Sequence, residues 1–258
     1  MADTHPTGSH SIGTGTHGAA RGSAHASGVA TGVASASDAL ALAAVGDIRS
    51  GMIVGIGTGR TAARATRALA DRVHREGLSI RCVCTSDGSE ALARELNLPT
   101  IPFSELEAVD YLFDGAAEVD TELRMLKGQH GALAQQRLVA RAAKRSVYLV
   151  DESKLVSRLG EQATLPVCVM AFGLAFVREE LRMLGLAGVV RRNMVGEYFV
   201  TDSGALIIDV MMPQREPEQV ADEIDAVPGV IDHGLFLSEA TEVLVERKSG
   251  LIDRMMRE

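Results

Sequence analysis

The clearest candidates for chemistry are an acid and a lysine in one stretch, YLFDGAAEVDTELRMLKGQHG (residues 111–131). Asp114 ends an apolar run predicted to form a buried strand over residues 109–113, and ligands of open α/β sheets bind at such carboxyl ends. Lys127 opens a glycine-bounded turn before a predicted helix, which offers a positive charge and free backbone N–H groups to an anion. The stretch therefore fits a phosphorylated small molecule, and it fits a solvated Lys–Asp pair on a surface turn equally well.

A second glycine-rich turn also precedes a helix. Residues 52–56 are typical of a buried parallel strand, and Gly57-Thr58-Gly59-Arg60-Thr61 leads into a predicted helix over residues 62–76. Free N–H groups at a helix N-terminus, together with two hydroxyls, suit a phosphate. The spacing matches neither the dinucleotide fingerprint nor the P-loop, so this turn alone is a weak signal.

Both turns belong to a repeated strand–helix pattern. Further strands are predicted over residues 80–84 and 146–150, and strands alternate with helices four times in this half of the chain. Such alternation predicts an α/β fold with a Rossmann-like, doubly wound parallel sheet. The carboxyl ends of parallel strands meet along one edge, and here they carry Thr58, Thr85, Ser86, Asp114, Asp151 and Lys154. We therefore predict a binding site along that edge.

The pattern changes after residue 164. A β-α-β-β-α-β order over residues 164–232 predicts a smaller ferredoxin-like α+β domain. Residues 235–237 and 242–246 are expected to return to the main sheet. The predicted domains are a tail over residues 1–36, a Rossmann-like domain over residues 37–163 and 233–258, and the ferredoxin-like domain over residues 164–232.

Composition excludes several classes of protein. The 258 residues carry a formal net charge of −8 without a basic stripe, which argues against nucleic-acid binding, and no apolar run is long enough to span a membrane. Cys82 and Cys84 alternate on a strand and so face opposite sides, which does not suit a metal site. Together with Cys168 they indicate buried thiols in a reducing cytoplasm.

The tail is almost entirely Gly, Ser, Thr, Ala and His, so we expect it to be disordered and its scattered histidines to bind no metal specifically.

Eight stretches between about residue 38 and residue 250 form a longer pattern. They are IVGIGTGRTA, TSDGSEALARELNLP, VDYLFDGAAEVD, LKGQHGAL, VDESKLVSRLG, LPVCV, FVTDSGALIID and PGVIDHGLFL. In order and spacing the chain resembles the type A ribose-5-phosphate isomerases. The resemblance implies a Rossmann-like domain paired with a ferredoxin-like one, no cofactor, and a homodimer or homotetramer. It also implies interconversion of D-ribose 5-phosphate and D-ribulose 5-phosphate through an enediol(ate), in the pentose phosphate pathway.

The resemblance also assigns residues to a sugar phosphate site. The reaction needs a base for a carbon-bound proton, groups that stabilise an oxyanion, and a phosphate anchor. Asp114 and Lys127 match residues at the sugar end, and Lys154 matches a binding lysine. No metal is implied. The implied substrate-binding set is Thr58, Gly59, Arg60, Thr61, Thr85, Ser86, Asp114, Gly115, Ala116, Ala117, Lys127, Gly128, Gln129 and Lys154.

Several positions depart from the family's pattern. The acid turn of the family reads Asp-Gly-Ala-Asp-Glu, and here Ala117 replaces the second Asp. The family's general base, a Glu, corresponds to Gln136, whose amide cannot abstract a carbon-bound proton. Gln129 and His130 stand in a loop that is usually a run of glycines, and Arg60 replaces a serine.

Two interpretations follow. In the first, the protein is an isomerase with a substitute base. His130 is the better candidate, because its ordinary pKa of about 6.5 suits proton transfer near neutrality, and Glu118 is the other. The simpler interpretations are a loop imidazole bonded to the backbone for His130 and a carboxylate at a helix start for Glu118. In the second, the protein binds a sugar phosphate without isomerising it.

Overall fold

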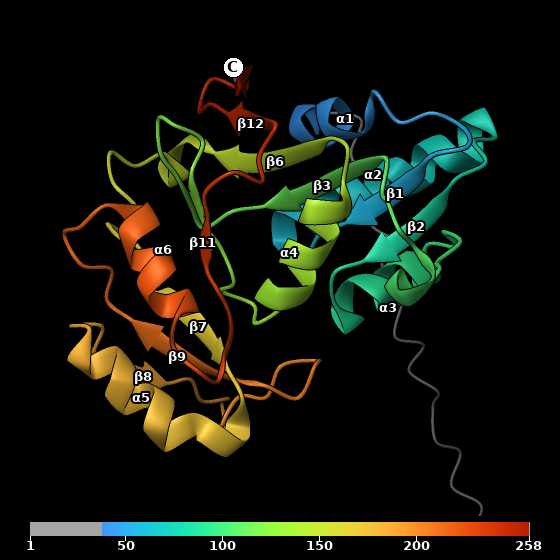
Figure 1. The fold of residues 1–258 in the computed structure, drawn as a ribbon. Helices are drawn as coiled ribbons and strands as arrows, with labels where there is room; N and C mark the ends of the chain where they lie inside the picture. Colours follow the sequence, from blue (N-terminus) through green and yellow to red (C-terminus); the bar gives the residue numbers. More distant parts are fainter. Residues whose placement is uncertain (1–37, 258) are drawn as a thin grey trace, which may run out of the picture. The chain divides into compact units, whose positions relative to one another are not determined.

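The computed structural model describes residues 38–257, and the predicted tail over residues 1–36 lies outside this range. Within it the chain forms a large, mainly parallel sheet, a smaller antiparallel sheet, and a third sheet of three very short strands (Figure 1). The predicted combination of a Rossmann-like sheet with a smaller antiparallel α+β module is confirmed, whereas the limits of the domains stay a prediction.

The large sheet has the order β13-β12-β6-β3-β1-β2 and is parallel except for the edge strand β13. In that order the strands are Ile252–Met256, Glu242–Glu246, Ser146–Asp151, Tyr111–Gly115, Ile53–Ile56 and Arg81–Cys84. In chain order, β2 is added on one side of β1, and β3, β6, β12 and β13 are then added on the other side. The switch point therefore lies between β1 and β3, and ligands of such sheets bind beyond the strand ends at that place.

Helices cover both faces of this sheet, as a parallel sheet requires. On one face α1 (Ala39–Val45), α2 (Arg60–Glu76) and α3 (Asp87–Glu95) enclose an apolar core, and α4 (Leu133–Ala142) packs on the other (Figure 1). The first helix begins at Ala39, because Asp38 Oδ1 accepts a hydrogen bond from the N–H of Ala41 at 3.0 Å and caps the helix.

The antiparallel sheet has the order β10-β7-β9-β8. In chain order its elements are β7 (Leu165–Val169), α5 (Leu174–Met183), β8 (Gly188–Val190), β9 (Leu206–Val210), α6 (Pro217–Asp225) and β10 (Val230–His233). This is the predicted β-α-β-β-α-β order, and we call these elements and their connections the ferredoxin-like module. Its helices and sheet enclose a core of their own, which includes Val177, Leu181 and Ile208.

The third sheet departs from the predicted pattern. It has the order β11-β5-β4, with strands Leu235–Phe236, Met125–Leu126 and Glu118–Val119. The expectation that residues 235–237 return to the main sheet is wrong, because β11 pairs with β5 instead. Residues 242–246 do join it, as β12 beside β6. The short hairpin of β4 and β5 brings Lys127 back beneath the end of β3.

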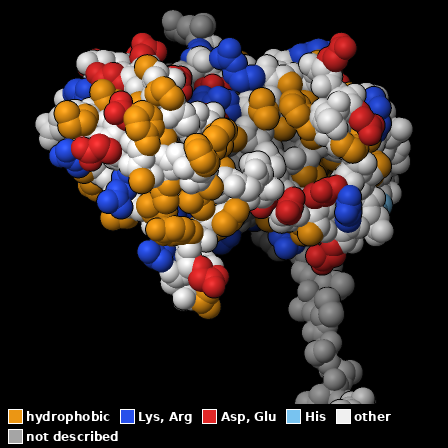
Figure 2. Space-filling view, turned by 60° about the horizontal axis from the view of Figure 1, so that its bottom comes forward, with side chains coloured by type: hydrophobic (Ala, Val, Ile, Leu, Met, Phe, Trp, Pro, Cys, Tyr) orange, Lys and Arg blue, Asp and Glu red, His pale blue; other side chains and the backbone are white. Residues whose placement is uncertain are grey.

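The surface is unevenly apolar. Hydrophobic side chains gather on the ferredoxin-like module, on the left in Figure 2. The exposed large ones there include Phe172, Phe176, Met183, Val189, Met194 and Val195, which we call the apolar face. Among residues 38–257, no helix combines the length and the apolar character needed to cross a membrane.

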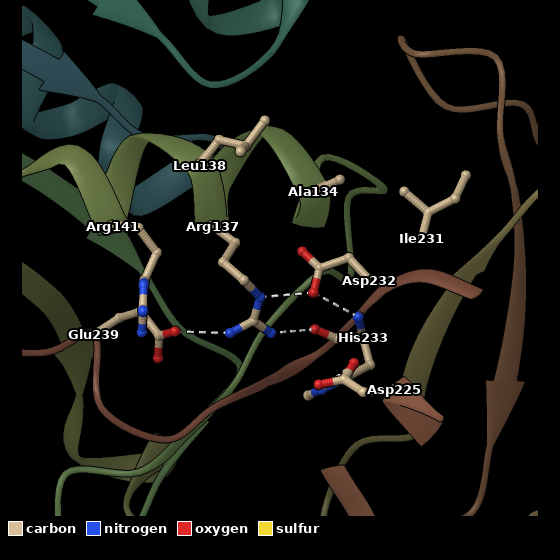
Figure 3. A pocket seen from close by; sticks show the side chains of 9 residues that line it. All are labelled: Ala134, Arg137, Leu138, Arg141, Asp225, Ile231, Asp232, His233 and Glu239. Atoms are coloured by element: carbon tan, nitrogen blue, oxygen red, sulfur yellow. Dashed lines mark hydrogen bonds and ion pairs between the residues drawn. The ribbon is translucent and has the colours of Figure 1, made fainter. Parts of the chain in front are cut away.

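Arg137 ties helix α4 to the end of β10 and to the segment that follows it. Its Nε donates to Asp232 Oδ1 at 2.6 Å, its Nη1 to Glu239 Oε1 at 2.8 Å and its Nη2 to the carbonyl oxygen of His233 (Figure 3). Nη2 also donates to the carbonyl oxygen of Leu235. Both carboxylates are buried, and the network lines a hollow of about 470 Å³ between α4 and this segment. The guanidinium is therefore a structural cross-link between the two parts of the fold.

Replacing Arg137 by Met should lower the free energy of unfolding by about 3 to 5 kcal/mol, because two buried carboxylates lose their counter-charge. Urea denaturation followed by circular dichroism measures this change. The matched control is Arg141→Met, one helical turn further on at an exposed position, which should cost about 0.5 kcal/mol or less. Equal effects of the two substitutions would show that the network does not cross-link the fold.

Candidate active site

Asp114 lies at the carboxyl end of β3, fully buried, and collects four hydrogen bonds. Its Oδ1 accepts from the backbone N–H groups of Thr58 at 3.0 Å and Gly115 at 2.7 Å. Its Oδ2 accepts from Lys127 Nζ at 3.0 Å and Gln136 Nε2 at 2.8 Å. One carboxylate therefore joins the turn after β1, the end of β3, the loop after β5 and helix α4.

Lys127 is buried beneath the same strand ends. Its Nζ also donates to the carbonyl oxygen of Gly115, and it lies 5.0 Å from the ring centre of Tyr148 and 5.5 Å from that of Phe236. Burial lowers the pKa of Lys127, and the charge of Asp114 opposes this shift. The ammonium is thus a preorganised donor in a poorly hydrated place, where it can stabilise a developing negative charge.

A pocket of about 200 Å³ opens above this ion pair. Its lining is Thr58, Gly59, Arg60, Thr61, Gly115, Ala116, Ala117, Lys127, Gly128, Gln129, His130, Gln136 and Lys154. The structure thus brings most of the predicted site residues together at the switch point. Asp114 lies just beneath the lining, bonded to Lys127. Thr85 and Ser86 lie behind the first turn, where their hydroxyls are each 2.8 Å from that of Thr58.

One wall of the pocket is built for an anion. Helix α2 begins at Arg60, directly after Gly59, so the free N–H groups of its first turn face the lining. The first turn of the helix carries no acidic residue. Lys154, at the end of the short segment after β6, adds a positive charge, and within residues 38–257 it forms no ion pair.

His130 closes the pocket from the glycine-bounded loop. Its ring lies against Gly59, where an added Cβ would come within 2.9 Å of the imidazole Cε1, and the φ of Gly59, +103°, also favours glycine. Burial lowers the pKa of His130, and the charges of Lys127, Arg191 and Arg60 lower it further while Asp114 opposes them. At neutral pH the imidazole is therefore uncharged and able to accept a proton.

Glu118 plays a different part. It lies in strand β4, so the interpretation as a helix-start carboxylate is wrong. It is fully buried and accepts from the N–H groups of Gly160, Gln162 and Ala163 at 2.5, 2.6 and 2.7 Å. Its carboxylate is committed to these backbone groups and does not line the pocket, which leaves His130 as the candidate base.

Comparisons with known proteins agree with this geometry. The family model of ribose 5-phosphate isomerase A (phosphoriboisomerase A) matches residues 81–250. Ribose-5-phosphate isomerase A of Sphingopyxis alaskensis is 42% identical over 208 residues, which are 80% of this chain and 90% of that one. This chain belongs to the ribose 5-phosphate isomerase A family.

Solved structures of the family share the fold. Ribose 5-phosphate isomerase A from Methanocaldococcus jannaschii superposes with a TM-score of 0.80 at 36% identity, over 84% of this chain and 96% of that one. A D-ribose-5-phosphate isomerase in complex with phospho-erythronic acid gives a TM-score of 0.81 at 31% identity, with the same coverage of both chains. Family membership thus rests on sequence and fold together.

Within this ribose 5-phosphate isomerase A fold, Gln136 occupies the position that the resemblance assigns to the family's base. A carboxylate only accepts hydrogen bonds, so Gln136 must turn its NH₂ group toward Asp114. Its carbonyl oxygen is then the atom available to the pocket, where it can accept from a hydroxyl but holds no basic lone pair for a carbon-bound proton.

Two side chains near the loop fall outside the predicted roles. Gln129 Nε2 donates to the carbonyl oxygen of Thr164 at 3.0 Å, so its amide is turned toward the start of the ferredoxin-like module. Arg191, which sequence patterns did not single out, donates to the carbonyl oxygens of Gly128 and Gln129. In the sequence Arg191 is only an arginine that follows a strand, and arginines in that position are too common to predict this contact. Within residues 38–257, no group of three or more His, Cys, Asp or Glu side chains is arranged to hold a metal ion.

Substituting Asp114 by Asn should lower the free energy of unfolding at pH 7 by about 3 to 5 kcal/mol, because Lys127 stays buried without its counter-charge. Loss of the Asp114 charge lowers the pKa of Lys127 further in the folded state. The unfolded chain then binds the proton more tightly, so the deficit should shrink as pH rises toward about 10.4. Denaturant titrations between pH 7 and pH 10 measure it, and a deficit that does not change with pH would contradict a charged Lys127.

Proposed function

We propose that the protein interconverts D-ribose 5-phosphate and D-ribulose 5-phosphate, with His130 as the base. The carrying observation is the placement of an uncharged imidazole on the pocket lining, among the Asp114–Lys127 pair and the start of α2. A base near its working pH, a buried cation and an anion cradle are the three parts that the reaction needs.

The charges suggest how the substrate lies. The phosphate binds at the N-terminus of α2 with Arg60 and Lys154, and the carbonyl end of the open sugar reaches the Asp114–Lys127 pair. A relative bound to phospho-erythronic acid, an acidic sugar phosphate, supports this class of ligand. Gln136 then accepts from a sugar hydroxyl through its carbonyl oxygen.

Proton transfer follows from this placement. His130 takes the proton from C2, the C–H electron pair forms the C1–C2 double bond, and the carbonyl oxygen on C1 becomes an oxyanion beside Lys127. The imidazolium then returns the proton to C1, while the proton of the C2 hydroxyl passes to the C1 oxyanion, so that C2 becomes the ketone and C1 becomes a hydroxymethyl group. No net charge or redox equivalent leaves the site, and no cofactor is needed.

A second function is favoured by the bonding of Gln136. The amide of Gln136, held by Asp114 at 2.8 Å, replaces the carboxylate of the family's base, and Ala117 replaces the second aspartate of the acid turn. A protein that keeps the anion cradle and lacks a competent base would bind a sugar phosphate without isomerising it. Loss of a general base typically lowers the rate by about 10²- to 10⁴-fold, so weak turnover alone would not separate the two.

His130→Ala should lower kcat for ribose 5-phosphate by about 10²- to 10⁴-fold, because it removes the proton acceptor. In the native protein kcat/KM should fall as pH drops through a pKa below 6.5, since the imidazole must be unprotonated to act. A coupled assay of ribulose 5-phosphate formation measures both effects. The matched control is His74→Ala, an exposed histidine in the last turn of α2.

The binding function makes the opposite prediction. The native protein would then be inactive, and Gln136→Glu combined with Ala117→Asp would gain turnover. Both functions predict a thermal shift with ribose 5-phosphate, because a ligand at 100 times its Kd adds about 2.7 kcal/mol to the stability of the folded state. Absence of any shift would refute both.

We also propose that the chain forms a homodimer or homotetramer through the apolar face. Phe172 is 99% exposed and Val189 71% exposed, and apolar side chains gather on this module (Figure 2), as they do at protein–protein contacts. A twofold axis through such a patch buries it against itself. The three free cysteines support a cytoplasmic location, since thiols persist in a reducing compartment.

Light scattering should therefore give a multiple of the 27.3 kDa chain mass. Phe172→Glu combined with Val189→Glu should shift the protein to the monomer, because two charges cannot be buried in the contact. Leu251→Glu, which changes a residue that is 67% exposed and lies outside the apolar face, should leave the mass unchanged. A native protein of monomer mass would sink the proposal.

A further inference from the structure

The connection between β8 and β9 reaches out of the ferredoxin-like module to the pocket. Residues 191–205 form an antiparallel excursion, in which Phe199 N–H donates to the carbonyl oxygen of Arg191 and Thr201 N–H to that of Ala205. In Figure 1 this orange loop extends from the module toward α3. None of its residues is among the predicted site residues, yet three of them contact segments that build the pocket.

Arg191 makes the most specific of these contacts. Its Nη1 donates to the carbonyl oxygens of Gly128 at 3.1 Å and Gln129 at 3.0 Å, the two residues before His130. Its other nitrogens form a two-pronged pair with Asp209 of β9, at 2.8 and 2.5 Å. The guanidinium is mostly buried, so both the carboxylate and the loop carbonyls hold it in one orientation.

Two further contacts tie this connection to the rest of the fold. The Phe199 ring lies against Gly131, where an added Cβ would overlap it, and the Arg191 guanidinium lies 5.9 Å from the centre of that ring. Asp202 Oδ2 accepts from the N–H of Asp87 at 2.9 Å, at the start of α3 and next to Ser86. One connection thus touches both the glycine-bounded loop and the start of α3.

We propose that Arg191 is a positioning residue for the pocket, holding the loop that places His130 over Gly59. A base on a loop needs such support, because displacement of a reacting group by about 1 Å can cost about 10²-fold in rate. Arg191 does not line the pocket, so it reaches a bound substrate only through this loop. The proposal rests on the proposed function of His130, and its structural part can be tested without turnover.

Arg191→Met removes the hydrogen bonds to both carbonyls, and Arg191→Lys keeps the charge but loses the planar fork. The matched control is Arg192→Met, whose guanidinium lies 4.8 Å from the Tyr198 ring and donates to Gly196 within the same excursion. We expect both Arg191 variants to lower kcat for ribose 5-phosphate by about 10- to 100-fold with KM nearly unchanged, because the phosphate cradle is elsewhere. Arg192→Met should behave as the native protein.

Titration of the His130 ring by NMR provides a readout that needs no activity, with the resonance assigned by its loss in His130→Gln. The charged groups that face the ring are Asp114, Lys127, Arg60 and Arg191. In Arg191→Met a positive neighbour is gone and the loop is more hydrated, so the pKa of His130 should rise toward its ordinary value.

The lysine variant separates position from charge. If Arg191 positions the loop, Arg191→Lys also raises the pKa of His130; if it acts by charge alone, Arg191→Lys leaves the pKa where it is and the proposal is overturned. An unchanged pKa and kcat in Arg191→Met overturns it as well. Should the native protein lack turnover, the proposed function fails, and the titration still decides whether Arg191 holds the loop.

Discussion

The site depends on one buried carboxylate that must be satisfied. Asp114 ends a strand in the middle of the sheet, where water cannot replace missing donors, and an unpaired charge there would cost several kcal/mol. The fold supplies four donors, two for each carboxylate oxygen. The N–H groups of Thr58 and Gly115 donate to Oδ1, and the side chains of Lys127 and Gln136 donate to Oδ2. The same carboxylate explains why residue 57 is a glycine, because a Cβ there would overlap the carboxylate of Asp114. The same four donors hold four segments around one pocket.

Local patterns predict this convergence well, because it follows from topology. Strands that alternate with helices form a parallel sheet, and their carboxyl ends meet, so Thr58, Asp114 and Lys154 come together without any knowledge of their contacts. The ferredoxin-like module is predicted for the same reason, from the order of its elements. What the sequence does not predict is the bonding of individual side chains and the presence of very short strands. Two-residue strands such as β4 carry no periodicity that a sequence could reveal.

Contacts between distant residues are the part that patterns miss. Glu118 looks like a helix-start acid beside Asp114, yet it accepts from three backbone N–H groups more than forty positions away. Gln129 stands on the pocket loop, yet its amide bonds to Thr164. Arg191 and its partner loop are separated by more than sixty positions. Each contact joins segments that are far apart in the chain, and no local window of sequence contains both partners.

The amide at position 136 changes what the site must do. A carboxylate there would lie 2.8 Å from Asp114 Oδ2, and two acids so close would share one proton, which raises the pKa of the pair. The amide removes that repulsion and donates to Asp114, so that each carboxylate oxygen has two donors. In the reaction that we propose, proton transfer falls to His130, which lies outside this network.

His130 stands on a loop, and sites on loops are less exact than sites on helices. In that proposal the contacts of Arg191 and Phe199 with residues 128–131 supply, from the second module, the support that α4 would give to a base of its own. With its base on the loop, the geometry of the proposed site depends on the packing between the two parts of the fold.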